Sequence, residues 1–266
     1  MFGEPEGTVR LLDAEPTLAR GIERRLLDEA REKLIAEVRR VEAGPWEEAG
    51  VIPSDPLFLG YLILEGALIR EIDVSGRPSI ELLGPGDLIR PWVVPQALDA
   101  LHVNDEWSLL STGHIAIVDE SFHEKAQGYP SILTVLMDRV VARARWLGFQ
   151  VALSQLTRID HRLLLTFRYV AERWGVDDPR GVKIPIRLSH RNLAALIGAR
   201  RPKVSSALTT LSECDLIEQS PDGTWTFFAA DIDPMAVLAG TDDRPYSIGN
   251  SGRLVRTGDR ITLIHD

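Results

Sequence analysis

The stretch SHRNLAALIGARRPKVSSALTTLSECDLI, residues 189–217, decides the fold prediction. Ser189 is a typical N-cap for a short helix through Ile197, and Gly198 stands where a tight turn needs left-handed backbone. Pro202 fits the first turn of a second helix, where its missing N–H costs nothing. Two short helices joined by a glycine turn predict a helix-turn-helix, whose second helix has the size that enters a major groove.

The second of these helices starts with basic and hydroxyl side chains. Arginine at the start of a recognition helix can bond guanine through two atoms, and serine can donate to phosphate. We therefore expect Arg200, Arg201 and Ser206 to read bases. The residues expected to hold phosphate are Ser189, Arg191, Lys203 and Ser205. The alternative is a helical hairpin that only fills a core.

The residues that follow favour DNA binding over a core hairpin. EQSPDGTWTFF, residues 218–228, places Pro-Asp-Gly, a typical hairpin turn, between two short strands. A helix-turn-helix followed by a β-hairpin is a winged helix-turn-helix. The sequence therefore predicts this module in the C-terminal half.

Charge gives two opposite indications. The formal charge of −9 and pI of about 5.2 argue against a nucleic-acid binder. Residues 180–212, however, contain seven Lys and Arg and no Asp or Glu. Such a stretch is typical of a polyanion-binding face, and the alternative is a solvated face paired with acids elsewhere in the fold.

Two helices are predicted upstream of this module. Residues 157–174 have an amphipathic pattern, and residues 131–156 have apolar side chains at strict 4-3 spacing. So narrow an apolar stripe favours a two-helix contact, and hence a homodimer, over packing on the protein's own β domain. The predicted dimer residues are Leu133, Met137, Val140, Ala144, Leu147 and Val151.

The N-terminal half has two different patterns. Residues 19–42 have helical periodicity, and we expect one long packing helix there. Residues 51–120 contain short β-rich runs separated by Gly, Pro, Asp and Ser, which predict a small sandwich or barrel. Asp177 to Pro179 predict a hinge between domains.

This order of elements resembles the Crp/Fnr family of bacterial transcription regulators. The resemblance is carried by LAALIGARRPKVSSALTTL (193–211) with DLIEQSPDGTWTF (215–227), by ELLGPGDLIRPW (81–92) and by HRLLLTFRYVAERWG (161–175). It implies an α+β fold with a jelly-roll-like β-roll sensor, a long dimerisation helix and a winged helix-turn-helix. The expected domains are an N-terminal helix and effector-like β-roll (1–130), the dimerisation helix (131–156), the DNA-binding domain (157–230) and an extension (231–266).

The resemblance also implies an effector pocket, at Gly86, Asp87 and Arg90. Members that bind cyclic AMP hold its phosphate with a Gly-Glu pair and an Arg followed by Ser or Thr. Here Arg90 and Pro91 stand where the Gly-Glu pair would be, so we expect no tight cyclic AMP binding, and the effector is unknown. The family's usual recognition pattern is also altered, because Arg201 is retained but Pro202 and Ser206 replace a Glu and a second Arg.

The sequence favours no catalytic site, metal or certain cofactor. The single cysteine, Cys214, excludes an internal disulfide, and His102, His114 and His123 show no close metal-ligand pair. The chain is interpreted as a cytoplasmic, homodimeric, sequence-specific regulator of transcription without membrane contact. Its partners would be double-stranded DNA and, if it activates, RNA polymerase. The alternatives are an effector-independent repressor or architectural protein and, remotely, a barrel enzyme.

Overall fold

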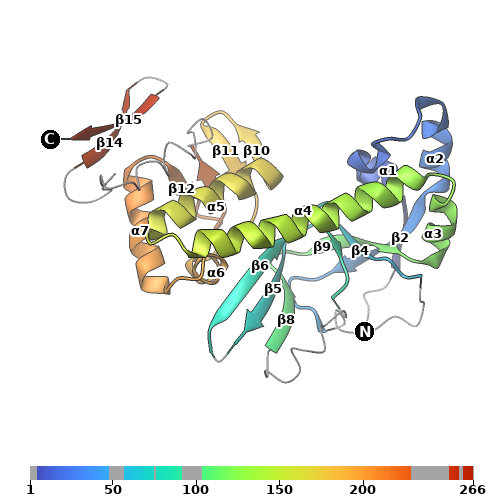
Figure 1. The fold of residues 1–266 in the computed structure, drawn as a ribbon, viewed down its shortest axis with the longest axis horizontal. Coiled ribbons are helices and arrows are strands. Elements are labelled where there is room, and N and C mark those ends of the chain that lie inside the picture. The colour runs from blue at the N-terminus through green and yellow to red at the C-terminus, as the bar shows by residue number, and fades with distance from the viewer. Residues whose placement is uncertain are drawn as a thin grey trace. The chain divides into compact units, whose positions relative to one another are not determined.

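The computed structural model describes residues 5–47, 57–74, 76–91, 104–228, 252–257 and 260–265. The chain divides into two compact units, Met1–Phe149 and Gln150–Asp266. Figure 1 shows a β-rich N-terminal unit and a smaller mixed C-terminal unit. Each unit has its own secondary structure and is considered by itself.

Two antiparallel sheets form the N-terminal unit, with strand orders β1-β2-β9-β4-β7 and β3-β8-β5-β6. They confirm the β-roll predicted for residues 51–120 as far as the described residues extend; residues 51–56 and 92–103, with His102, lie outside them. The strands are β1 (Pro5–Arg10), β2 (Ile35–Val41), β3 (Gly44–Pro45), β4 (Gly60–Glu65), β5 (Leu68–Asp73), β6 (Pro78–Leu83), β7 (Leu88–Ile89), β8 (Asn104–Leu109) and β9 (Gly113–Val118).

Alternation along the strands divides the buried residues into two cores. Tyr61 and Ile63 of β4 pack between the two sheets, together with Trp107 of β8, whereas Leu62 joins a second core. Because successive side chains of a strand point to opposite faces, β4 contributes to both cores. The second core contains Leu11, Phe122 and Leu136, from the helices that cover the first sheet (Figure 1).

The single long helix expected at residues 19–42 is wrong. The segment forms a 3₁₀ turn at Arg24–Leu26, a short helix α2 (Leu27–Lys33) and then strand β2. Strand β2 lies between β1 and β9 and pairs with both. Ile35 and Val38 fit a helical stripe, but they are β-branched and satisfy this sheet equally well.

Two further helices, α1 (Leu11–Ala14) and α3 (Glu120–Ala126), and most of the long helix α4 (Pro130–Ser154) belong to the N-terminal unit, which ends at Phe149. The inner face of α4 buries Ile132, Leu136 and Trp146. Arg143 of α4 reaches the β-roll, where it forms two hydrogen bonds of 2.5 and 2.7 Å with the buried carboxylate of Glu81. This contact fixes α4 to β6.

The C-terminal unit combines three helices with a four-stranded sheet of order β10-β11-β13-β12. The sheet contradicts the hinge predicted at Asp177 to Pro179, because this segment leads from β10 into the paired β11. The helix predicted at residues 157–174 is confirmed as α5. The elements are α5 (Ile159–Trp174), β10 (Val176–Asp178), β11 (Gly181–Ile184), α6 (His190–Leu196), α7 (Arg201–Glu213), β12 (Ile217–Gln219) and β13 (Trp225–Phe227).

Trp225 forms the centre of this unit's core. Its indole packs 5.1 Å from the Phe167 ring of α5, and its Nε1–H donates to the Leu188 carbonyl at 2.8 Å. Later in the chain, β14 (Gly252–Thr257) and β15 (Arg260–His265) pair as an antiparallel hairpin. No helix of the described residues is long and apolar enough to cross a membrane.

Candidate DNA-binding site

Helix α6 and the turn after it have the predicted geometry. The Ser189 side chain accepts a hydrogen bond from the Asn192 N–H at 3.1 Å, and the Ser189 N–H donates to Asn192 Oδ1 at 3.0 Å. These reciprocal bonds form a capping box, which fixes the start of α6. Gly198 has φ +64, so it supplies the left-handed residue that reverses the chain toward α7.

Helix α7 begins with exposed cations. Arg200 is its N-cap in extended conformation and makes no side-chain cap, and the first turn contains no acidic residue. The side chains of Arg200, Arg201 and Lys203 are all exposed. The first N–H groups of a helix lack partners within the helix and carry partial positive charge, so this end favours an anion such as phosphate.

The three serines differ in what their hydroxyls already contact. Ser189 is engaged in the capping box, and Ser205 Oγ lies 2.9 Å from His190 Nδ1. Ser206 donates to the Pro202 carbonyl at 3.2 Å and is exposed. Ser189 and Ser206 are thus exposed, whereas Ser205 is half-buried. The contact from His190 links α6 to α7, and no local sequence signal indicates this histidine.

The wing consists of β12 and β13, which are joined by the turn at residues 220–224. Strands β12 and β13 pair from Ile217 with Phe227 to Gln219 with Trp225. Hydrogen bonds from the Thr224 hydroxyl and backbone N–H, with Lys183 and Arg187 nearby, lower the pKa of Asp222 below its ordinary value. These two cations lie in the acid-free stretch, which was the sequence signal for them. Arg187 is exposed and Lys183 half-buried, and together they add positive charge beside the turn.

The end of α4 and the segment after it are tied to the helix-turn-helix. The Arg162 guanidinium of α5 donates to the Leu156 carbonyl at 2.7 Å and to the Ile197 carbonyl at 3.2 Å. Gln150 donates to the Leu196 carbonyl at 3.4 Å. Because Ile197 is the C-cap of α6, these bonds connect the end of α4 with the turn that sets α7.

In the N-terminal unit, the three residues predicted for an effector pocket have distinct environments. Asp87 is buried, and its carboxylate accepts from the Gly84 N–H at 2.9 Å. The Gly86 carbonyl accepts from Arg139 of α4 at 2.6 Å, and Arg90 is exposed. Gly86 has φ +89, and an added Cβ would lie 3.0 Å from the Arg139 guanidinium. These contacts make residues 84–87 a turn that fastens α4 to the sheet.

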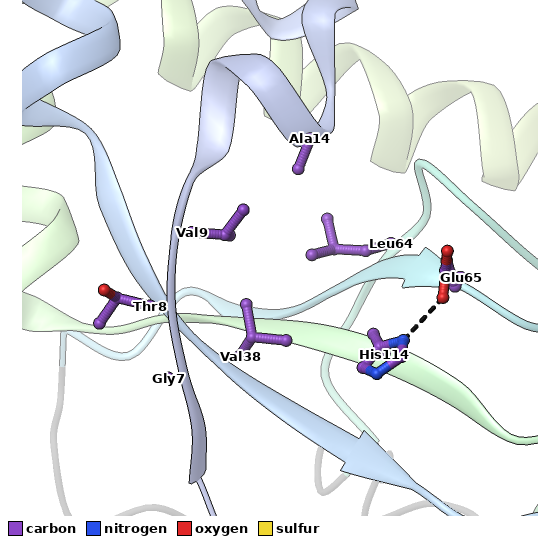
Figure 2. Close-up of a pocket in the computed structure, with 8 residues that line it drawn as sticks. All are labelled: Gly7, Thr8, Val9, Ala14, Val38, Leu64, Glu65 and His114. Carbon is purple, nitrogen blue, oxygen red and sulfur yellow. Dashed lines mark hydrogen bonds and ion pairs between the residues drawn. The ribbon is translucent and has the colours of Figure 1, made fainter.

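A pocket of about 470 Å³ lies elsewhere on the N-terminal unit (Figure 2). It opens between β1, β2, the end of α1 and the paired ends of β4 and β9. Gly86, Asp87 and Arg90 are not among its lining residues. Sequence periodicity gave no sign of it, because its walls come from five separate elements. The lining residues are Gly7, Thr8, Val9, Ala14, Val38, Leu64, Glu65 and His114.

Fold and site together define a winged helix-turn-helix protein with an N-terminal β-roll unit. Residues 157–227 match the family model described as the Crp-like helix-turn-helix domain. Among curated proteins, no relative matches the chain significantly.

The matching solved structures include Crp/Fnr-type proteins from several bacteria. A CooA mutant from Carboxydothermus hydrogenoformans has a TM-score of 0.56 at 14% identity, over 82% of this chain and 92% of that one. FixK2 from Bradyrhizobium japonicum has a TM-score of 0.54 at 17% identity, over 74% and 95%. A CRP/FNR-family transcriptional regulator from Thermus thermophilus has a TM-score of 0.51 at 17% identity, over 79% and 100%.

These matches confirm the resemblance predicted from the sequence. The C-terminal module is a Crp-like helix-turn-helix domain, and the chain has the fold of Crp/Fnr transcription regulators. At 14% to 17% identity, the solved structures establish the fold alone and do not identify an effector or an operator for this chain.

Proposed function

We propose that the protein is a homodimeric, sequence-specific, DNA-binding regulator of transcription in the cytoplasm. One observation carries this proposal: α7 of a Crp-like helix-turn-helix domain starts with exposed Arg200, Arg201 and Lys203. The chain is acidic as a whole, yet this end of α7 lies in a stretch of 33 residues without an acid. An acidic surround with one basic face presents that face to DNA and repels DNA elsewhere.

The exposed residues divide into base readers and phosphate contacts. Arg201, Arg200 and Ser206 read base edges in the major groove, and Lys203 and Arg191 hold phosphate. Ser189 and Ser205 support phosphate binding indirectly. Their hydroxyls contact Asn192 and His190 and so stabilise the backbone around the phosphate contacts. Arg187 and Lys183, beside the wing, add phosphate contacts on the flank.

The second subunit covers the outer face of α4. The predicted dimer residues Met137, Val140, Leu147 and Val151 are 37% to 65% exposed, which is unusual for apolar side chains at regular spacing. The inner face of α4 is already packed against the β-roll unit through Leu136 and the Arg143 contact. Pairing two copies of α4 would bury the outer stripe and leave each sensor's own core intact.

A small effector acts through the sensor unit and biases the spacing of the two recognition helices. Any such ligand must bind one arrangement better than the other. Of the predicted pocket residues, Gly86 and Asp87 lie in a turn that Arg139 of α4 contacts, which is the contact through which an effector there would act. Cyclic AMP is not the expected effector, and RNA polymerase is the partner if the protein activates.

The second candidate function is an effector-independent repressor or architectural protein. The observation that favours it is the interior of the roll, where Trp46, Tyr61 and Trp107 fill the space between the sheets. A barrel enzyme is the most remote alternative. Within the described residues, no group of three His, Cys, Asp or Glu could hold a metal ion.

The testing experiment is selection of bound sequences from a random double-stranded DNA pool, followed by measurement of the variant Arg201→Ala. We expect a two-half-site operator. The variant should lose about 1–3 kcal/mol on it and relax the preference at one base position. The matched control is Arg145→Ala, an exposed arginine of α4. Equal loss on random DNA would make Arg201 a phosphate contact, and no enriched sequence would refute a sequence-specific regulator.

A further inference from the structure

The pocket in Figure 2 has one polar end and an apolar wall. Val9, Val38 and Leu64 point into the same space, with Ala14 above them. At one end, Glu65 Oε2 lies 2.7 Å from His114 Nδ1. A volume of about 470 Å³ is within the range of small-molecule sites.

Two irregularities of the sheet create this space. The β4–β9 register shifts between Ile63 and Glu65, so Leu64 is an extra residue and Glu65 comes opposite His114. The β1–β2 register shifts in the same way between Pro5 and Gly7, and Gly7 has φ +135. Bulges bend a strand and redirect its side chains, and they occur often beside binding sites. Both bulges border this one pocket.

The lining residues select the charge of a ligand. Glu65 and His114 are the only ionisable side chains among the residues that line the pocket, and no Lys or Arg is among them. An anion would be repelled at that end, whereas an ammonium group would approach the Glu65 carboxylate. The apolar wall opposite suits a chain of several methylene groups.

We propose that this pocket is a binding site for a small aliphatic amine. The ammonium group contacts Glu65, and the chain lies against Val9, Val38 and Leu64. The site is separate from the turn at Gly86 to Arg90 that the resemblance indicated.

The pocket is connected to the dimer helix by a short chain of contacts. Ala14, which lines the pocket, ends α1, and the next residue is Glu15. Glu15 forms an ion pair with Arg139 of α4 at 3.3 Å, and Arg139 also donates to the Thr17 hydroxyl at 2.5 Å. Arg139 precedes Val140 of the outer stripe. An amine that shifts α1 would therefore change the position of α4. The resulting effect on DNA affinity rests on the proposed DNA-binding function.

Binding is tested by titration calorimetry of the full chain with the amines from propylamine to heptylamine. We expect saturable binding of hexylamine below about 10 mM, tightening about fourfold with each added methylene. Matched carboxylates should bind at least about fivefold more weakly. Glu65→Gln should weaken amines about fivefold and leave the matched alcohols unchanged. Val38→Trp should fill the pocket and abolish binding, whereas Val74→Trp, on exposed β-roll surface, should not.

Carboxylates that bind as tightly as amines, or Glu65→Gln without effect, would overturn the amine assignment. Absence of saturable binding by any member of the series would overturn the site itself. Both outcomes are independent of DNA, so they do not depend on the proposed function.

Coupling is tested by measuring operator affinity with and without hexylamine. We expect a change of at least about fivefold, which is the usual lower bound of coupling between sites. Arg139→Gln should keep amine binding and lose this change, while Arg145→Gln, on the same helix, should keep both. If hexylamine binds but leaves operator affinity unchanged, the connection through Arg139 is wrong. If the protein binds no operator at all, the proposed function fails while calorimetry still decides the site.

Discussion

At the scale of single residues, backbone geometry and burial explain more than residue type. Gly198 is required by its positive φ, whereas Gly148 lies in the middle of α4. An added Cβ would meet nothing within 4 Å at either position. The two glycines therefore differ only in backbone conformation, which makes them a matched pair.

We predict opposite effects of alanine at these two glycines. Gly198→Ala should destabilise the C-terminal unit by about 1–2 kcal/mol, because only glycine adopts the left-handed region without strain. Gly148→Ala should stabilise α4 by roughly 0.8–1 kcal/mol, because alanine is the better helix former. Urea unfolding of the two variants measures both changes. A stabilised Gly198→Ala would contradict the turn geometry.

A second residue-scale prediction concerns His161 of α5. It is 3% exposed, its Nδ1 has no hydrogen-bond partner within the described residues, and burial lowers its pKa below 6.5. Below pH 6.5 the unfolded chain binds a proton that the folded chain binds only at lower pH. The contribution of neutral His161 to the free energy of unfolding is therefore fully present above pH 6.5. It is lost as pH falls below 6.5, by at most about 1.4 kcal/mol per pH unit.

The measurement is urea unfolding of the wild-type chain and of His161→Leu between pH 7.5 and pH 5.5. The wild type should lose more stability over this range than the variant, because the variant has no imidazole to protonate. Parallel losses in the two proteins would show that other groups cause the pH dependence.

At the scale of elements, α4 shows how one helix can present two different faces. Ile132 and Leu136 are buried against the β-roll, and Arg139 and Arg143 bind it through hydrogen bonds. The outer stripe follows one position later along the sequence. Adjacent residues of a helix point about 100° apart, so the two faces do not compete.

We predict that Val140→Glu converts the dimer to a monomer. Val140 is 42% exposed in the single chain, so the substitution costs little there but places charge inside a helix pair. Sedimentation measures the state, and operator affinity should fall more than about tenfold as one half-site is lost. The control Ala142→Glu, at an exposed position off the stripe, should stay dimeric. A dimeric Val140→Glu would refute this interface.

The hinge that a sensor would use is also an element-scale question. The sequence pattern predicts it at Asp177 to Pro179, a segment that instead leads from β10 into the paired β11. The bonds from Gln150 and Arg162 tie the last turn of α4 to the helix-turn-helix, and the division between the two compact units falls after Phe149. The end of α4 thus belongs to the DNA-binding unit, a division that helical periodicity does not reveal.

At the scale of the whole molecule, the distribution of charge matters more than its sum. The net charge is −9, but residues 180–212 have seven cations and no anion. In the fold, Lys183 and Arg187 come near the wing turn, and Arg201 and Lys203 begin α7. Screening acts over about a Debye length of 8–10 Å, so DNA responds to this local charge first.

We predict a steep salt dependence of DNA binding despite the acidic sum. Each phosphate contact should contribute about −0.9 to the slope of log affinity against log salt concentration. Lys203→Gln should reduce the slope by about one unit and weaken random and specific DNA alike. Filter-binding titrations at several salt concentrations give the slopes. Lys125→Gln, an exposed lysine of α3, should leave the slope unchanged, and an equal effect of both would contradict a local contact.

The sequence by itself determined the helix-turn-helix, its wing and the long helix before it. These elements depend on local signals, namely the Ser189 cap, the Gly198 turn, the position of Pro202 and the 4-3 spacing from Leu133. Each signal acts within a few residues of the chain, so periodicity and turn chemistry are sufficient to find it. Strands β10 and β11 were missed because they are short and only their pairing partners define them.

Only the tertiary structure decided the course of residues 19–42, the surroundings of Asp87 and Ser205, and the existence of the pocket. Ile35 and Val38 suit a helix or a strand, and pairing of β2 with β1 and β9 made the choice. The pocket joins Val9 to Leu64 and His114 across two bulges. Such contacts link residues far apart in the chain, and a local sequence pattern does not reveal them. A bulge also changes which face of the sheet a side chain occupies, which the local pattern does not show either.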